Sequence, residues 1–423
     1  MELAEKITIL SAAAKYDASC ASSGAPQNGQ DAGNGKGRRS LGVNVPAGVC
    51  HSWTGDGRCV SLLKVLYSNV CRYDCAYCVN RASADIPRTS FTAGELVELT
   101  CEFYRRNYIE GLFLSSGIFS DPDIVMEKLI ETAKKLRTEA GYGGYIHLKI
   151  IPGSGEKLIR EAGRWADRLS ANIELPTDKS LQTLAPQKSG REILRAMEET
   201  FRTGVEYEED RRRIRSTPVF APAGQSTQII VGVSAEDDRQ IIALSGALYR
   251  KFGLRRVYYS AFMPVGNPGW GGIPDPRLPE ISTPPLAREH RLYQADWLLR
   301  FYHFTAAEIL EDGSYLDKRL DPKTAWALKH PERFPVEVSR ADYEELLRVP
   351  GIGVKSCRRI IETRRSRSLS FDILRRLGVT LKRARYFITV AGAALDRLDD
   401  LGRVSRILAD SGGAGFQLPL FEF

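Results

Sequence analysis

The sequence lacks the features of membrane proteins and of small secreted proteins. None of its 423 residues lie in a run approaching the roughly 18 to 20 apolar residues that a membrane-spanning helix needs. Met1 is followed by Glu2 and Glu5, not by a basic and then apolar leader. The eight cysteines are too widely spread to form the dense disulfide framework of a secreted domain. We therefore expect a cytoplasmic protein that makes no contact with a membrane.

The composition also excludes a repeat protein and a fully disordered chain. No internal repeat of the solenoid type is visible, and 43% hydrophobic and 26% charged residues are ordinary for a globular protein. The length favours two to three domains. Residues 20–49 are rich in Gly, Ser, Ala and Asn and bury too little apolar surface to order themselves, so we interpret them as a mobile insert. A short helix is predicted before it, over residues 2–16.

An alternation of strand and helix patterns begins at Cys59. The apolar run Cys59–Leu66 predicts a buried parallel strand. Thr92 and Glu95 have the spacing of a capping box, so a helix is predicted over residues 93–108. Further strands are predicted at residues 111–117, 145–151, 170–175, 226–233 and 256–262. Such an alternation favours an α/β fold whose parallel sheet curls into a partial or full barrel, with its chemistry at the carboxyl ends of the strands.

Three cysteines crowd together directly after the first of these strands. Cys71, Cys75 and Cys78 have the spacing C-x3-C-x2-C. Three thiolates can hold three irons of a cubane cluster and leave the fourth iron open. A zinc site is the alternative, but structural zinc normally takes four ligands and no fourth is obvious here. The segment resembles the signature of the radical S-adenosylmethionine (SAM) superfamily, C-x3-C-x-aromatic-C, with Tyr77 at the aromatic position.

The resemblance implies both cofactors and a reaction type. It implies a [4Fe-4S] cluster on the three cysteines and S-adenosylmethionine bound through its amine and carboxylate to the open iron. One electron, supplied by a donor such as a flavodoxin or ferredoxin, would then cleave the sulfonium to a 5′-deoxyadenosyl radical. The implied fold is a partial (β/α)6-type barrel, which excludes water and aligns one substrate hydrogen.

Other residues are candidates for contacts with S-adenosylmethionine. Ser115, Ser116 and Gly117 end the second predicted strand, where the superfamily has a GGE-like motif that meets the methionyl amine; the glutamate is absent here. Asn172 and Glu174 share one face of the fourth predicted strand by its two-residue alternation. Because polar side chains that point into a barrel are costly as packing, we predict that both contact the cofactor.

Two weaker signals complete the barrel region. The segment Gln228–Val233 resembles the one that lies beside adenine in the superfamily. Cys50, His51 and Cys59 could ligate an auxiliary cluster or metal, and the alternative is that they are ordinary buried side chains. The remaining thiols, Cys20, Cys101 and Cys357, are weaker candidates for the same role.

A strongly basic segment lies near the C-terminus. Residues 348–385 contain twelve Lys and Arg against two acidic residues, a net charge of +10 in a chain whose total is +8. Gly351 and Gly353 separate two helical patterns, an arrangement that resembles a helix-hairpin-helix module. Its glycines let backbone N–H groups approach a phosphate, and three cations follow on the second helix: Lys355, Arg358 and Arg359. A degenerate second copy occupies residues 373–383. We predict nucleic-acid binding through phosphates with little sequence preference, and a protein contact is the alternative.

The last residues carry a further motif. A Gly-rich linker at 411–415 precedes a sequence similar to the QL-x-LF pentapeptide with which bacterial repair proteins dock on the sliding clamp, formed by Gln417, Leu418, Leu420 and Phe421. Apolar anchors on a mobile tether suit short-peptide recognition. The alternative is a terminal strand that packs on its own domain.

The order of motifs along the chain resembles one family of radical SAM proteins assigned to DNA modification or repair. Shared with it are residues 14–24 and 50–59, the cysteine loop and the basic module; in that family a uracil-DNA-glycosylase-like protein is the inferred partner. We predict an N-terminal helix and flexible insert at 1–55, a radical SAM barrel at 56–280, a helical connector at 281–340, an all-α helix-hairpin-helix domain at 341–410 and a flexible tail at 411–423.

Three functional hypotheses follow. The first is a radical enzyme that acts on a DNA base or sugar, with a flipped nucleotide entering the barrel. The second is an RNA-modifying radical enzyme, because a basic module does not distinguish the two nucleic acids. The third is a DNA-binding scaffold whose cluster is structural.

Overall fold

The computed structural model describes residues 1–14, 49–53, 59–264, 275–281, 283–311 and 313–410. They form two compact units. Unit 1 comprises Met1–Glu236 and Ala247–Leu286, and unit 2 comprises Asp237–Gly246 and Ala287–Phe423. No helix in the described ranges has both the length and the apolar character needed to cross a membrane.

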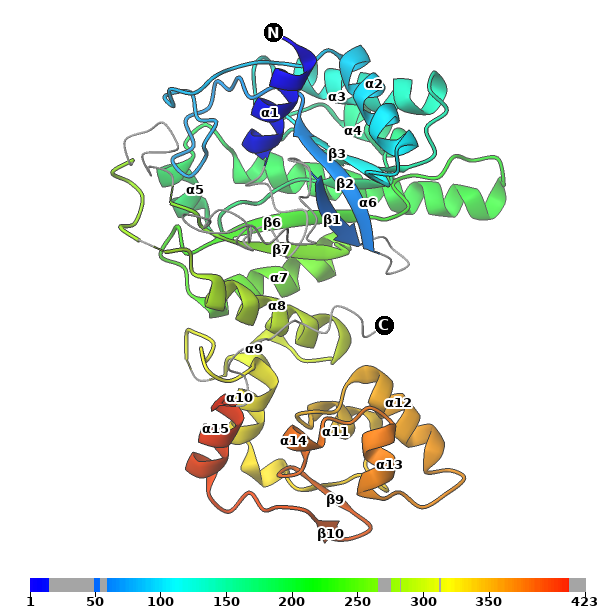
Figure 1. Cartoon of the computed structure of the whole chain (residues 1–423), viewed down its shortest axis with the longest axis vertical. Helices are drawn as coiled ribbons and strands as arrows, with labels where there is room; N and C mark the ends of the chain where they lie inside the picture. The colour runs from blue at the N-terminus through cyan, green and yellow to red at the C-terminus, as the bar shows by residue number, and fades with distance from the viewer. Residues whose placement is uncertain (15–48, 54–58, 265–274, 282, 312, 411–423) are drawn as a thin grey trace, which may run out of the picture. The chain divides into compact units, whose positions relative to one another are not determined.

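Unit 1 is built on a seven-stranded sheet whose strands follow one another in sequence order (Figure 1). The strands are β1 (Val49–Trp53), β2 (Cys59–Leu66), β3 (Gly111–Ser115), β4 (Tyr145–Lys149), β5 (Arg168–Ser170), β6 (Gln225–Val231) and β7 (Arg256–Ala261). β1 pairs with β2 in the antiparallel sense and all other pairs are parallel. This is an α/β fold with a curled, half-barrel sheet, so the predicted fold class is confirmed for this part of the chain.

The helices of this region follow the strands. They are α1 (Leu3–Ala14), α2 (Ala93–Arg105), α3 (Pro122–Thr138), α4 (Glu156–Trp165), α5 (Asp178–Leu184), α6 (Gly190–Arg213) and α7 (Asp238–Phe252), the last being divided between the two units. The predicted capping box begins α2: Thr92 Oγ1 accepts the N–H of Glu95, and Glu95 Oε2 accepts the N–H of Thr92. α2 ends at Arg105, three residues before the predicted end, and Asn107 follows with a φ of 56°.

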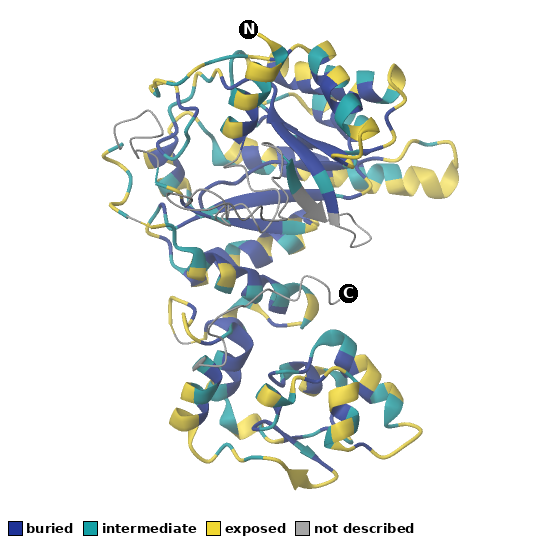
Figure 2. Cartoon of the chain, in the orientation of Figure 1, coloured by how far each residue is buried: buried dark blue, intermediate teal, exposed yellow. Residues whose placement is uncertain are grey.

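The sheet is buried on both faces, as is usual for parallel strands (Figure 2). One face carries apolar neighbours such as Leu63, Leu112 and Ile146, all fully buried. The opposite face carries an in-register row of different chemistry, formed by Lys64, Phe113, His147 and Arg168. These side chains are also buried, so this face places the cations Lys64 and Arg168 beside apolar neighbours such as Phe113.

Two strand predictions need correction. The predicted strand over 170–175 is wrong, because β5 already ends at Ser170 and Glu174 has a φ of 63°, which is incompatible with a strand. The two-residue alternation therefore does not reach Asn172 and Glu174. β1 was not predicted, because its five residues owe their strand geometry to antiparallel pairing with β2 and carry no alternation of their own.

Unit 2 consists of short helices around a small sheet. Its elements are α8 (Leu286–Phe301), α9 (Ala306–Ile309), α10 (Pro322–Lys329), the 3-10 turn η2 (Pro331–Arg333), β8 (Val336–Glu337), α11 (Tyr343–Arg348), α12 (Val354–Thr363), α13 (Phe371–Arg376), α14 (Leu381–Ala384), β9 (Ile388–Val390), β10 (Ala393–Ala394) and α15 (Leu401–Asp410). β9 pairs with β8 in parallel and with β10 in antiparallel fashion. The prediction of an all-α C-terminal domain is therefore wrong: strands of two or three residues are too short to leave a periodic pattern.

The core of unit 2 lies between two helix pairs, α11–α12 and α13–α14. Leu346, Ile352, Cys357 and Leu374 are almost completely buried there. The turns of the two pairs meet, because the backbone N–H of Thr380 donates to the carbonyl oxygen of Gly351 at 2.9 Å.

Candidate functional site

The three predicted cluster cysteines lie in the loop that follows β2. Cys75 is buried, and Cys71 and Cys78 are half-buried. The loop is anchored from outside itself by two backbone hydrogen bonds: Ala76 donates to Leu184 at the end of α5, and Arg72 donates to Ile118 beyond β3. Elements far apart in the sequence thus hold the cysteines at the carboxyl end of the sheet.

Arg88 fastens this loop to itself. Its Nη1 donates to the carbonyl oxygens of Asn69 at 2.5 Å and Asn80 at 2.9 Å. Its Nη2 donates to those of Arg81 at 2.6 Å and Ala84 at 2.9 Å. A single rigid guanidinium therefore connects the residues before and after the cysteines. Sequence reasoning missed Arg88, and no motif marks it.

The environment of the thiols fits a multinuclear cluster. Burial raises the pKa of Cys75, and burial followed by the neighbouring Cys75 and Cys71 raises the pKa of Cys78 to about 12. The thiols thus lie near enough to oppose one another's ionisation, and a strongly positive metal group is needed to stabilise three thiolates there.

A cluster and a single zinc ion make different demands on their ligands. Within the described ranges, no group of three or more His, Cys, Asp or Glu side chains converges as the ligands of one ion do. A cubane cluster binds each thiolate to a different iron, so its cysteines lie further apart than the ligands of one zinc. When bound, such a cluster together with S-adenosylmethionine supplies a carbon-centred radical that can abstract a substrate hydrogen.

A buried ion pair lies beside the cysteine loop. Lys188 Nζ donates to Glu174 Oε1 at 2.8 Å and lies 5.6 Å from the centre of the Tyr77 ring. Although burial opposes its charge, the Glu174 carboxylate raises the pKa of Lys188 well above its usual value. Burial likewise raises the pKa of Tyr77. The ammonium group also favours the thiolate form of Cys75. Lys188 is a second residue of the site that sequence reasoning missed.

The segment Ser115–Gly117 lies against the entrance of the cysteine loop. The N–H of Gly117 donates to Ser68 at 2.7 Å, and the carbonyl oxygen of Ser115 accepts the N–H of Tyr67 at 2.7 Å. A Cβ at Gly117 would lie 2.5 Å from the carbonyl oxygen of Val70, so only glycine permits this approach. Ser115 is buried, whereas Ser116 and Gly117 are half-buried.

Asn172, Glu174 and Gln228 come together, although not through strand alternation. Asn172 Nδ2 donates to Gln228 Oε1 at 3.2 Å. The backbone N–H of Glu174 donates to the carbonyl oxygen of Gln228 at 3.0 Å, and Ile230 donates to that of Glu174 at 2.8 Å. The segment Gln228–Val233 therefore neighbours the other two predicted cofactor residues. Their contact with S-adenosylmethionine stays a prediction.

The other cysteines divide into two groups. Cys50 packs against the apolar cluster of Val60, Leu62 and Phe113, while the side chains of His51 and Cys59, and all of Cys20, lie outside the described residues. Cys101 on α2 and Cys357 on α12 are buried. Burial raises the pKa of both thiols, that of Cys357 to about 12, which suits thiols that serve packing.

The predicted nucleic-acid residues of unit 2 lie at and after the turn between α11 and α12. Gly351 has a φ of 86°, and Gly353 is the N-cap residue of α12 without any side-chain cap. Lys355 is half-buried, and Arg358 and Arg359 are exposed on α12. The four residues of the clamp-like motif, Gln417, Leu418, Leu420 and Phe421, lie outside the described residues.

A buried lysine supports this turn from behind. Lys323 Nζ donates to the carbonyl oxygen of Ile352 at 2.6 Å and lies 4.6 Å from the centre of the Tyr302 ring. Burial lowers the pKa of Lys323 to about 7. Sequence reasoning missed this residue, which belongs to α10 and is distant from the turn along the chain.

One family model matches part of unit 1. The family model described as the Radical SAM superfamily matches residues 65–209, which include all three cysteines. No curated relative matches the chain at a significant level.

Three solved structures share part of the fold. A crystal structure of HydG, a maturase of the [FeFe]-hydrogenase, matches with a TM-score of 0.41 and 16% identity over 55% of this chain and 48% of that chain. HydG from Carboxydothermus hydrogenoformans gives 0.40 and 15% over 56% and 49%. Methylornithine synthase (PylB) gives 0.36 and 18% over 55% and 60%. The chain thus spans about half the length of the HydG structures, and at these TM-scores the likeness carries no inference about the reaction.

Residues 65–209 therefore match a radical SAM domain, and the cysteine loop lies within the match. That this loop holds the cluster stays a prediction. The match supports an enzyme of the radical SAM class, whose members use a [4Fe-4S] cluster and S-adenosylmethionine, and the cysteine-rich loop fits these cofactors. The match favours a reactive cluster over the third hypothesis, a scaffold whose cluster is structural.

The Lys188–Glu174 pair yields a first test. We expect Lys188→Met to lower the free energy of unfolding of unit 1 by about 3 kcal/mol, because it leaves the buried Glu174 carboxylate unpaired. Lys188→Met/Glu174→Gln should recover most of that loss. Urea unfolding of the reconstituted enzyme, followed together with its iron content, measures both. If the double variant is no more stable than Lys188→Met, the pair does not hold this segment.

Proposed function

We propose that the protein is a radical SAM enzyme that modifies or repairs DNA. One observation carries the proposal. The start of α12 has no side-chain cap and is followed by exposed cations, and it belongs to the same chain as the cysteine loop. Unit 2 would hold the nucleic acid, and a flipped nucleotide would enter the barrel of unit 1.

The start of α12 has the properties of a phosphate site. The first four N–H groups of a helix have no partner within the helix, and no side chain caps those of α12. Gly351 and Gly353 keep the approach to these N–H groups free of side chains. A phosphate placed there meets both the N–H groups and the positive end of the helix dipole. The two helix pairs, joined turn to turn by Thr380 and Gly351, are consistent with a helix-hairpin-helix module and its degenerate second copy.

The charge of this region supports a polyanionic partner. Exposed cations follow the turn, namely Arg358 and Arg359 on α12 and Arg365 just after it, and others lie on α13 and α14. Contacts of this kind bind the phosphate backbone and carry little sequence information. Sequence preference, where it exists, would then come from the nucleotide that enters the barrel.

An RNA-modifying enzyme is the second candidate. The same turn and the same cations could bind an RNA helix. The described part of unit 2 shows no group of side chains arranged to recognise the 2′-hydroxyl that distinguishes RNA from DNA. The resemblance of the motif order to a DNA modification or repair family favours DNA.

Two protein partners form part of the proposal. The sequence pattern of Gln417, Leu418, Leu420 and Phe421 supports docking on a sliding clamp, and the family resemblance supports a uracil-DNA-glycosylase-like partner. Each is tested by co-purification, for the clamp with and without residues 417–423; equal recovery of the clamp by both forms would refute that contact. A flavodoxin or ferredoxin is the proposed electron donor.

The decisive experiment measures product and binding together. The anaerobically reconstituted enzyme is given a strong reductant, S-adenosylmethionine and DNA duplexes with defined lesions or matched RNA. We expect 5′-deoxyadenosine to form, more with a DNA substrate than without, and DNA to compete better than RNA in a binding assay at fixed salt. A clear RNA preference would favour the second candidate. Binding to neither would remove nucleic acid from the proposal and leave the enzyme class untouched.

A further inference from the structure

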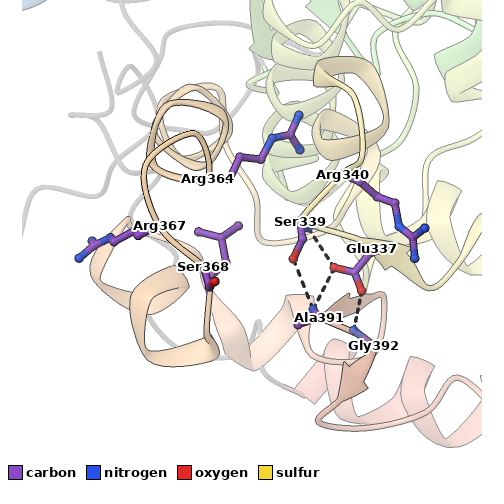
Figure 3. A pocket seen from close by; sticks show the side chains of 9 residues that line it. Glu337, Ser339, Arg340, Arg364, Arg367, Ser368, Ala391 and Gly392 are labelled. Carbon is purple, nitrogen blue, oxygen red and sulfur yellow. Dashed lines mark hydrogen bonds between the residues drawn. The ribbon is translucent and has the colours of Figure 1, made fainter.

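A cleft of about 530 Å³ opens in unit 2 at the far end of α12 from the turn discussed above (Figure 3). It lies among β8, the loop after α12 and the turn after β9. Neither the sequence analysis nor the proposed function uses this cleft. Its volume falls within the range of ligand sites.

The carboxylate of Glu337 lines this cleft and accepts hydrogen bonds from nearby backbone N–H groups. Glu337 accepts the backbone N–H groups of Ser339 at 3.0 Å, Ala391 at 3.0 Å and Gly392 at 2.9 Å. Ala391 and Gly392 have φ values of 50° and 81°, and this pair of left-handed residues turns its N–H groups toward the acid. Although burial opposes ionisation, the N–H groups of Gly392 and Ser339 hold the pKa of Glu337 down to about 2. The carboxylate thus stays ionised, and backbone N–H groups already occupy its oxygens.

The rest of the lining is cationic. Arg340, Arg364 and Arg367 all line the cleft, so with Glu337 the lining carries two more positive than negative charges. Arg364 Nη1 donates to the carbonyl oxygens of Val338 at 3.1 Å and Ala341 at 2.6 Å, which fixes that guanidinium in place.

The other two arginines are available to a ligand. Arg340 and Arg367 are exposed and extend on opposite sides of the cleft in Figure 3. No ion pair or side-chain hydrogen bond from the described part of the chain engages either guanidinium. The exposed hydroxyl of Ser368 adds a further donor at the same rim.

A row of exposed cations connects this cleft with the phosphate-binding turn. α12 runs from Val354 to Thr363, so the turn and the cleft are separated by about 15 Å. Arg358, Arg359 and Arg365 are exposed between or beside them. One strand of a duplex presents a regular row of phosphates, so a distance of this size reaches from one phosphate to another further along the strand. Cations that extend beyond the cleft favour a polymer over a small anion.

We propose that the cleft lined by Arg340, Arg364 and Arg367 is a second phosphate-binding site for the nucleic acid, further along the strand from the one at the Gly351–Gly353 turn. The inference rests on the proposed function, since it extends the footprint of the same nucleic acid. Arg340 and Arg367 each contact a phosphate of the strand, Arg364 lines the wall, and Glu337 holds the turn at residues 391–392 in place.

The test compares two variants that lose the same charge. Arg340→Gln/Arg367→Gln alters the cleft, and Arg403→Gln/Arg406→Gln removes two exposed cations from α15, outside it. Binding of the reconstituted full-length enzyme to duplexes is measured over a range of salt concentrations. The slope of log K against log salt should fall by about 2 in the cleft variant, because two phosphate contacts are lost, and stay unchanged in the α15 variant. Circular dichroism verifies that both variants are folded.

Other outcomes overturn the inference. If both variants have the wild-type slope, while Lys355→Gln/Arg358→Gln reduces it, the turn binds phosphate and the cleft does not. If inorganic phosphate or a mononucleotide occupies the cleft as tightly as a duplex does, the ligand is a small anion. If the wild-type enzyme binds no nucleic acid, the proposed function fails as well, and that result is distinct from the first two.

Discussion

Replacing Cys75 with alanine is expected to lower the iron content of the reconstituted enzyme at least tenfold, from about four atoms per chain, and to abolish release of 5′-deoxyadenosine. Cys75 is the buried member of the three cysteines, so no water or neighbouring side chain can replace its thiolate. Iron analysis, the visible absorption of the cluster and product chromatography measure the effect. The same loss is expected for Cys71→Ala and Cys78→Ala.

The control for this prediction is a second buried thiol of unit 1. Cys101→Ala on α2 removes a buried sulfur far from the cysteine loop in the sequence, and we expect about 1 kcal/mol less stability with unchanged iron. A Cys75→Ala variant that retains the iron and the cofactor cleavage of the wild type would contradict the assignment of the cluster. Equal iron loss in both variants would show that the thiols act through folding instead.

Local signals in the sequence explain which elements could be predicted. α2 follows from its capping box, and β2 from a continuous apolar run. The strands that the sequence did not predict are those whose conformation depends on pairing with another strand. β1 exists because it pairs with β2, and β8 and β9 are two and three residues long and lie far apart in the sequence. Glu174 shows the same limit, because its left-handed backbone conformation follows from its bonds to Gln228 and Ile230.

The site divides in the same way. The cysteines could be found because ligands on one short loop leave their spacing in the sequence. Arg88 and Lys188 could not, because each acts through contacts that only the fold creates: Arg88 binds four carbonyl groups with no side-chain pattern, and Lys188 meets Tyr77 from a distant segment. Lys323 meets Ile352 in the same manner. Candidate cofactor ligands can thus be predicted from a sequence more readily than the residues that position them.

The second large effect is expected at the turn between α11 and α12. We expect Gly351→Ala to lower the free energy of unfolding of unit 2 by about 4 kcal/mol or more. The residue has a φ of 86°, which an alanine adopts only with strain. The added methyl group would also lie 2.6 Å from the carbonyl oxygen of Thr380 and 3.1 Å from the backbone nitrogen of Ala384. Both contacts are with backbone, so the two helix pairs must separate to relieve them.

Gly392→Ala is the matched control, because it introduces the same backbone strain without a steric clash of the new methyl group. Gly392 has a similar φ of 81°, but a Cβ there would have no neighbour within 4 Å. We expect this variant to lose only about 1 kcal/mol. Hydrogen exchange of α11 to α14 measures the stability of unit 2, and iron content reports on unit 1, which should stay unchanged in both variants. Gly351→Ala should also lose nucleic-acid binding, because the turn that presents its N–H groups opens. Equal exchange rates in the two variants would show that the contact between the turns does not hold unit 2 together.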